Sequence, residues 1–186
     1  MQTSLAYSLR TSRPGYDFLS DRIKYINSFT LMQGDPKLKN ERKQEVGMNA
    51  RYRWLTLSVS YERIDNALTQ MFNIYGEDNM LLVKRSNIPQ PVRNLLVFLS
   101  ANPTWGVYSP GWSAGMQKPW THIEIDDPRA ESGMVNVSYT KPMFFLNFNN
   151  ACRFRHSWQV EANMNIMTKG DNLNFRMTSN AYNLGF

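Results

Sequence analysis

Residues 46–61 constrain the fold more than any other stretch, because apolar and polar side chains alternate along them. Apolar residues occupy every second position up to Trp54 and again from Leu55 onward, with small or polar residues between them. Alternation with a period of two is typical of a β-strand that has one apolar and one polar face. The alternation changes phase at residues 53–55. We therefore predict two antiparallel strands joined by a tight turn that carries an aromatic residue.

The same arrangement recurs further along the chain. Trp105 and Trp158 each stand at a predicted reversal between two alternating segments. Longer polar connections join the hairpins at their other ends. Short turns on one side, long loops on the other and aromatic residues at the interfaces are typical of transmembrane β-barrels. We predict that Trp54, Trp105 and Trp158 lie on one rim, at a membrane interface.

The predicted fold is all-β: an antiparallel up-and-down transmembrane β-barrel, present as a partial wall of about eight long strands. The strands are expected at residues 4–12, 43–54, 55–64 with a continuation to 75, 80–84 and 92–101 with an interruption at Pro89 and Pro91, 108–125, 135–154 with a kink at Pro142, 158–166 and 175–186. Most exceed the usual length of about five to six residues, and a membrane-crossing strand needs about 9–11. Length therefore favours a barrel over a soluble sandwich.

Residues 13–42 are predicted to form a long outer loop with a short extended piece at 29–33. A connection of this length is unusual in a compact soluble domain, whereas the outer loops of a barrel are expected to be long. The whole chain, 1–186, is interpreted as a single β-barrel domain or barrel fragment without a plug domain.

Composition excludes several classes of protein. The mean hydropathy is −0.49, and no apolar run approaches the roughly 18 residues of a spanning helix. The net charge is +6, but Lys and Arg are scattered, which argues against a nucleic-acid partner. The N-terminus lacks a basic segment followed by an apolar one, so no signal peptide is predicted. We expect a location in the bacterial outer membrane as part of a longer chain.

No pattern in the sequence predicts catalysis. Cys152 is the only cysteine, which leaves no disulfide framework and no cysteine-based metal site. It is predicted to be a small apolar filler on one face of a strand. A phosphate-binding glycine loop, a metal-spaced histidine cluster and a nucleophile elbow are all missing. We predict that the protein is not an enzyme, with no catalytic residue, cofactor or metal.

The polar positions of the alternating strands form the one candidate functional group. We predict that these residues face the lumen: Arg10, Glu45, Asn49, Arg51, Arg53, Glu62, Gln159, Glu161, Asn163 and Asn165. They either hydrate the lumen and pair across strands, or they line a solute path or contact a plug. For any single residue the first interpretation is favoured.

Three segments resemble a known family. Residues 7–19 resemble a phrase in which Tyr-Ser is followed by Arg-Pro-x-Tyr and a leucine at the start of an outer loop. Residues 34–41 resemble the next phrase, G-N-P-x-L-K-P-E, with departures at Asp35 and Asn40, and residues 51–63 resemble the hairpin after it. Together they resemble the C-terminal barrel region of TonB-dependent outer-membrane receptors.

This resemblance implies a barrel of about 22 strands filled by an N-terminal plug. It also implies energy-coupled uptake of a nutrient solute such as a metal chelate, a vitamin or a glycan. The implied partners are outer-membrane lipid, the TonB energy-transducing complex through the missing plug, and a surface lipoprotein. The family has no transferable ligand motif, so no binding residue is carried over.

Two alternatives remain open at this stage. One is a small self-contained outer-membrane barrel with an adhesive or structural role. The other is a soluble β-sandwich that binds glycans through exposed aromatic residues. The position of the three tryptophans separates them, since one shared rim indicates a barrel and burial between two sheets indicates a sandwich.

Overall fold

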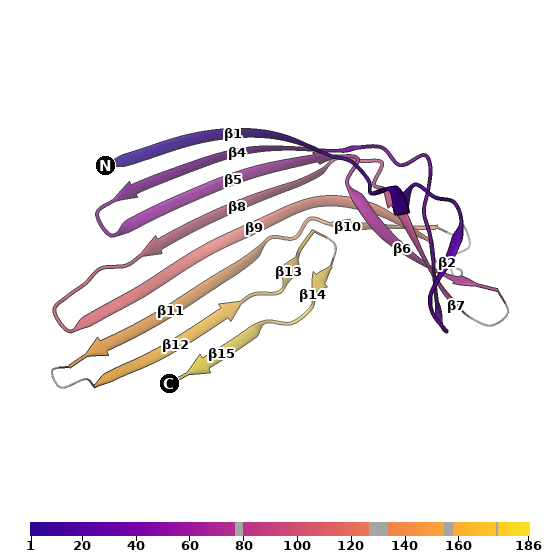
Figure 1. Cartoon of the computed structure of the whole chain (residues 1–186). Coiled ribbons are helices and arrows are strands. Elements are labelled where there is room, and N and C mark those ends of the chain that lie inside the picture. The colour runs from indigo at the N-terminus through magenta and orange to yellow at the C-terminus, as the bar shows by residue number, and fades with distance from the viewer. Residues whose placement is uncertain (77–79, 127–133, 155–157, 174) are drawn as a thin grey trace.

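The computed structural model describes residues 1–76, 80–126, 134–154, 158–173 and 175–186. Nine strands form one curved antiparallel sheet, of which eight lie side by side as the wall and the ninth, β10 (Met134–Tyr139), pairs with β9 alone (Figure 1). The order of the eight wall strands follows the chain: β1 (Gln2–Ser12), β4 (Glu41–Tyr52), β5 (Leu55–Asp65), β8 (Val92–Ala101), β9 (Tyr108–Asp126), β11 (Met143–Arg153), β12 (Gln159–Met167) and β15 (Ala181–Gly185). The predicted antiparallel up-and-down fold is confirmed. β1 and β15 are the two edges, so the described wall is an open, partial barrel.

Short turns gather at one end of the wall and long connections at the other (Figure 1). Two residues form the β4–β5 turn, and one of them, Arg53, adopts a φ of 54°. Trp54, Trp105 and Trp158 all lie in or beside the short turns, with exposed fractions of 48, 54 and 74%. They therefore share one exposed rim, which is the arrangement expected of a barrel. Both chain termini lie at this end too (Figure 1).

At the other end, two long connections build a second, smaller sheet that projects from the wall (Figure 1). Its strands, in spatial order, are β2 (Ile23–Asn27), β3 (Thr30–Gln33), β7 (Met80–Asn87) and β6 (Leu68–Tyr75). β3 and β7 are parallel, and the other pairs are antiparallel. β3 confirms the extended piece predicted within the loop 13–42, and a 3-10 turn, η1 (Tyr16–Phe18), precedes β2.

The prediction that the strand beginning at Leu55 continues to Tyr75 was wrong, whereas the interruption predicted at Pro89 and Pro91 is confirmed. Asn66 has a φ of 55°, a left-handed conformation that asparagine tolerates better than most residues. This residue ends β5, and β6 then leaves the wall for the small sheet. The returning chain leaves that sheet after Asn87 and rejoins the wall at Val92.

The predicted strand 135–154 is divided into two strands at Pro142, where a kink was predicted. β10 (Met134–Tyr139) pairs with the outer part of β9, whereas β11 pairs with its inner part. Pro142, which cannot donate to a ladder, lies between them. The predicted strand 175–186 begins only at Ala181, because a small hairpin of β13 (Gly170–Asp171) and β14 (Arg176–Met177) precedes it.

A compact apolar cluster lies where the wall meets the long connections. Its residues are Ala67, Ile88 and Val92, packed with Ile64, Ile123 and Leu173. Leu173 comes from the connection between β12 and β15, so this connection folds back onto the wall. Within the residues described, no helix is long and apolar enough to cross a membrane.

Candidate functional site: the two faces of the wall

Strand register sorts the side chains of the wall onto two faces, because directly opposed residues in a ladder point to the same side. On one face Arg10 opposes Lys43, Glu45 opposes Glu62, and Asn49 opposes Ser58. The same face continues across β11 and β12. We call it the polar face. Nine of the ten predicted lumen residues lie on it: Arg10, Glu45, Asn49, Arg51, Glu62, Gln159, Glu161, Asn163 and Asn165.

The tenth residue, Arg53, lies in the β4–β5 turn instead, with its guanidinium 5.5 Å from the centre of the Tyr52 ring. The alternation breaks at the turn, so the face of a turn residue does not follow from strand periodicity. That the polar face lines a lumen stays a prediction.

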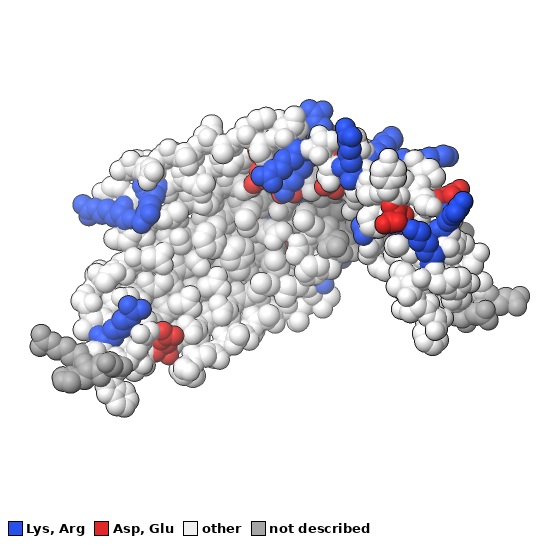
Figure 2. Space-filling view, in the orientation of Figure 1, with Lys and Arg blue, Asp and Glu red and all other residues white. Residues whose placement is uncertain are grey.

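Near the long-loop end, the polar face carries a small charged network. Glu45 and Glu62 are directly opposed like charges, an unfavourable arrangement unless a cation is near. Lys43 supplies that cation, with its Nζ 2.8 Å from Glu62 Oε2. The hydroxyl of Ser60 donates to Glu45 Oε1 at 3.3 Å. Figure 2 shows that charges gather where the wall meets the small sheet, while much of the wall is uncharged.

Toward the short-turn end the polar face becomes rich in amides. Asn147 opposes Asn165, which in turn opposes Asn183, and in the next rung Asn149 opposes Asn163. Asn147 Nδ2 donates to the hydroxyl of Ser113 at 3.1 Å. Side-chain amides both donate and accept hydrogen bonds, so this area can bind neutral polar groups as well as water.

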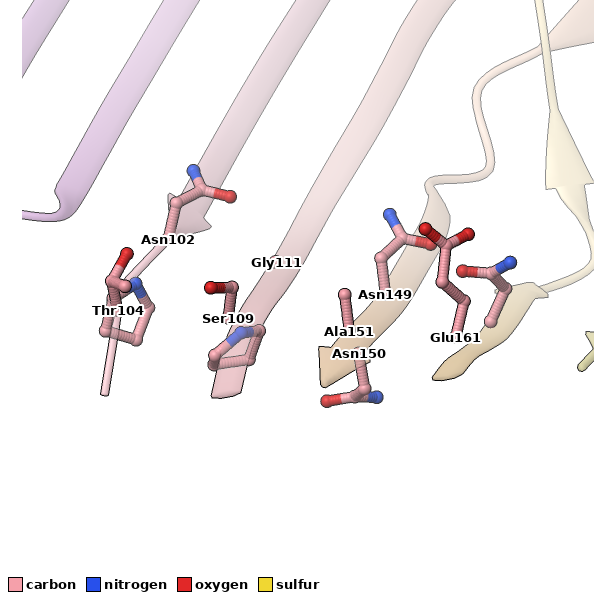
Figure 3. Close-up of a pocket in the computed structure, with 11 residues that line it drawn as sticks. Asn102, Thr104, Ser109, Gly111, Asn149, Asn150, Ala151 and Glu161 are labelled. Atoms are coloured by element: carbon pink, nitrogen blue, oxygen red, sulfur yellow. The ribbon is translucent and has the colours of Figure 1, made fainter. Parts of the chain in front are cut away.

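A cleft of about 490 Å³ opens in this amide-rich area. It is lined by the β8–β9 turn and by β9, β11 and β12, with these residues: Asn102, Pro103, Thr104, Ser109, Pro110, Gly111, Asn149, Asn150, Ala151, Glu161 and Asn163. In Figure 3 the side chains of Asn149 and Glu161 lie on the cleft side, whereas that of Asn150 turns away. Two predicted residues, Glu161 and Asn163, therefore meet here.

An aromatic pair interrupts the polar face at its centre. Phe98 and Phe145 oppose Gly115 from either side, and their rings stack with centroids 6.0 Å apart. A Cβ on Gly115 would lie 2.1 Å from the Phe145 ring. Because glycine has no side chain, the Phe145 ring can pack directly over residue 115. Packing of an aromatic ring over a glycine is a known feature of curved sheets.

The opposite face of the wall is apolar, and we call it the apolar face. A rung is a row of directly opposed residues across neighbouring strands, and the three middle rungs of this face contain no charged residue. The first consists of Tyr52, Leu55, Ala101, Trp112, Phe148, Met164 and Leu184, and the second of Thr3, Ala50, Leu57, Leu99, Ala114, Leu146, Ile166 and Tyr182. The third consists of Leu5, Met48, Val59, Val97, Met116 and Phe144. Leu5 is 76% exposed and Leu184 is 65% exposed. An apolar surface of this extent, uncovered in water, is a mark of contact with membrane or protein.

The height of the apolar face fits a membrane. Along β9 it is uncharged from Tyr108 to Met116. At ~3.4 Å per residue, eight steps span ~27 Å, and a strand tilt of ~40° reduces the height to ~21 Å. The apolar band of an outer-membrane barrel is ~25 Å tall.

An aromatic group marks the short-turn edge of the apolar face. The ring of Trp105 lies 6.0 Å from Tyr108 and 6.1 Å from Trp112. Asn150 Oδ1 accepts hydrogen bonds from the Tyr108 hydroxyl at 2.6 Å and from Trp112 Nε1 at 3.2 Å. The polar ends of both rings are therefore satisfied, as suits a position where one side is apolar and the other wet. The membrane-interface role of Trp54, Trp105 and Trp158 stays a prediction.

An ion pair with a buried carboxylate connects the last long connection to the wall. Asp171 is fully buried and accepts from the backbone N–H of Thr140 at 2.8 Å and of Lys141 at 2.9 Å. Arg176 Nε donates to it at 2.6 Å. Burial alone would raise the pKa of Asp171, but the hydrogen bonds from Arg176 and the two backbone amides outweigh it and lower the pKa to about 2.

The position of β13 requires glycine at residue 170. A Cβ there would lie 2.6 Å from the Pro142 carbonyl oxygen and 2.8 Å from the Met143 Cβ. Next to it, Gln117 Nε2 on the polar face donates to Asn172 Oδ1 at 3.1 Å. The connection therefore lies directly against the polar face near the long-loop end.

Two exposed faces of opposite character, at the height of a bilayer, are what a membrane-spanning barrel wall requires. The family model of the outer membrane protein beta-barrel family matches residues 1–186. The chain belongs to this family. The predicted location in the outer membrane is therefore confirmed, and the soluble sandwich alternative is not supported. A comparison with curated proteins finds no significant match.

Sequence reasoning missed part of this family member's polar face. The asparagines of β11 were not predicted, because apolar residues dominate the segment 144–148. The signal for them is the alternation that continues from Asn163 and Asn165 to Asn147 and Asn149 across the hairpin. Within the described ranges, no group of three or more His, Cys, Asp or Glu is placed to hold a metal ion. Cys152 lies on the apolar face, opposite Tyr108 and Val160.

Proposed function

We propose that this outer-membrane barrel protein forms part of the wall of a TonB-dependent receptor and contributes to energy-coupled uptake of a nutrient solute. The observation that carries the proposal is the segregation of one amide-rich face from one apolar face along all eight strands. The apolar face contacts outer-membrane lipid, and the polar face lines the lumen. The resemblance of residues 7–19, 34–41 and 51–63 to such receptors supports the assignment to this class.

In this role the wall binds and guides a solute and catalyses no reaction. Membership in the barrel family supports a structural or transport role. The lumen residues with amide and hydroxyl groups exchange hydrogen bonds with a passing polar solute, while the charged network around Glu62 lies nearer the long-loop end. Energy reaches the solute through a plug and the TonB complex, and a surface lipoprotein is a further proposed partner.

Uptake is the direct test of the transport proposal. Cells whose outer membrane contains the complete receptor with this wall should deplete one or more polar solutes from a mixed medium, measured by mass spectrometry of the medium. A protonophore should stop the depletion, because energy coupling depends on the inner-membrane gradient. Depletion that continues unchanged in the presence of the protonophore would indicate a passive pore and contradict the proposal.

A disulfide cross-linking test distinguishes a wall that is a section of a large barrel from a wall that closes on itself as a small barrel. In a Cys152→Ala background, Ser4→Cys on β1 and Asn183→Cys on β15 should form no disulfide within one chain, because the two edges stay apart. The control pair is Ser4→Cys with Asn49→Cys, which are directly opposed and should cross-link readily. Efficient cross-linking of the first pair in folded protein would favour a self-contained barrel of eight strands.

A further inference from the structure

The outer edge of the apolar face carries basic side chains that lumen transport does not use. Arg63 on β5 directly opposes Arg93 on β8, and Arg93 directly opposes Trp120 on β9. Lys118 lies one rung closer to the centre of the apolar face, opposite Leu95. We call Arg63, Arg93, Lys118 and Trp120 the basic rim. These residues lie at the long-loop end of the wall.

Three of the four residues of the basic rim are positively charged. Like charges directly opposite each other are unfavourable in an antiparallel pair. The nearest acid is Asp65, with its Oδ1 3.0 Å from Arg63 Nη2, and Asp65 also opposes Arg42. Asp65 therefore lies beside Arg63 and opposite Arg42, and among the described residues no ion pair involves Arg93. Arg93 is exposed, so it is free to meet an external anion.

The position of the basic rim fits a lipid headgroup. It lies directly above the charge-free rungs that end at Val59 and Val97. The Lys118 Nζ lies 5.0 Å from the centre of the Trp120 ring, so a cation and an amphipathic ring share this depth. Basic and aromatic residues at the border of an apolar band lie at the level of lipid headgroups.

We propose that the basic rim binds the phosphate of an anionic lipid headgroup in the leaflet on the long-loop side. The planar guanidinium groups of Arg63 and Arg93 match phosphate oxygens by paired N–H donors. The acyl chains then lie along the apolar face, beside Leu95 and Val97. This inference rests on the proposed function, since it needs the apolar face to contact lipid. Continuity with that face favours a lipid over a soluble anion.

The test measures lipids that bind to the full chain in neutral detergent, by native mass spectrometry with added phosphatidic acid or phosphatidylcholine. The unaltered chain should prefer phosphatidic acid. Arg63→Gln with Arg93→Gln should weaken phosphatidic acid binding by about tenfold or more, because charge-assisted hydrogen bonds to phosphate are lost. The matched control is Arg13→Gln with Arg22→Gln, which removes the same charge from the connection after β1 and should leave the preference intact.

The possible outcomes differ in what they overturn. Equal binding of both lipids, unaffected by Arg63→Gln with Arg93→Gln, would retain lipid contact at the apolar face and overturn the headgroup proposal. Binding of neither lipid would overturn the headgroup proposal and also contradict the lipid-facing wall. Displacement of phosphatidic acid by inorganic phosphate as readily as by a soluble short-chain phosphatidic acid would indicate a simple anion site. If the double variant does not fold, Arg93→Gln alone should show a smaller loss in the same direction.

Discussion

Leu57→Lys should strongly destabilise the wall in a lipid bilayer, while Ser58→Lys should be tolerated. Leu57 lies in the middle rungs of the apolar face, where every register neighbour is uncharged. A lysine at the bilayer midplane of a β-barrel costs about 2–4 kcal/mol of folding free energy, and substitutions on the lumen side are far milder. Ser58 is the next residue on the same strand and belongs to the polar face, opposite Asn49 and Phe98.

Urea unfolding of the chain folded in lipid vesicles measures this difference. We expect a loss of about 2–4 kcal/mol for Leu57→Lys and less than about 1 kcal/mol for Ser58→Lys. The pair is closely matched, since position on the strand and added charge are nearly the same. Equal destabilisation by both substitutions would mean that the two faces do not differ in their surroundings.

Asp171→Asn should release the connection between β12 and β15 from the wall. The substitution removes the negative charge that faces Arg176 and weakens the acceptor for the two backbone N–H groups at residues 140 and 141. Loss of one partner of a buried pair costs about 3–5 kcal/mol, but Arg176 is 42% exposed in its side chain and recovers part of this from water. We expect a loss of about 2 kcal/mol, seen as faster hydrogen exchange at Thr140 and Lys141.

An exposed ion pair serves as the control for this prediction. Asp17 and Lys24 form an ion pair of 2.7 Å in which the Asp17 side chain is 77% exposed. Solvent screens such an exposed pair, so Asp17→Asn should barely change exchange. If Asp17→Asn and Asp171→Asn had equal effects, the burial of Asp171 would not matter to the wall.

The pKa of Asp171 gives the same contact a pH dependence. Its pKa is lowered from 3.8 to about 2 in the folded protein. A lowered folded-state pKa means that the stabilisation is complete above about pH 4 and is lost as the pH falls toward 2. The protection of Thr140 and Lys141, expressed relative to intrinsic amide exchange at each pH, should therefore fall over this window in the unaltered chain. In Asp171→Asn this fall should be missing.

The wall could be predicted because the alternation of apolar and polar residues within each strand indicates its two faces. The alternation around residues 53–55 placed the hairpin at 43–54 and 55–64, close to the observed Glu41–Tyr52 and Leu55–Asp65. Amides and hydroxyls on one face and aliphatic side chains on the other are a local signal. This signal needs no knowledge of neighbouring strands.

The small sheet could not be predicted, because it depends on contacts between connections far apart in the chain. Leu31 lies beside Leu82 in a parallel pair, and nothing in either segment alone indicates the other. The basic rim has the same origin. Arg63 and Arg93 are unremarkable in sequence, and only the β5–β8 register makes them neighbours. Likewise, the burial of Asp171 arises from its packing against residues 140 and 141.

The central claim, that one face of the wall contacts lipid and the other contacts water, can be measured on two adjacent residues of β5. Spin labels are attached to Val59→Cys and Ser60→Cys, each in a Cys152→Ala background, in protein folded in lipid bilayers. Val59 belongs to the apolar face, and Ser60 belongs to the polar face, opposite Gly47. We expect the label at 59 to collide with oxygen and not with a water-soluble nickel chelate, and the label at 60 to show the reverse. Equal nickel accessibility at both positions, or the opposite pattern, would contradict this assignment of the two faces.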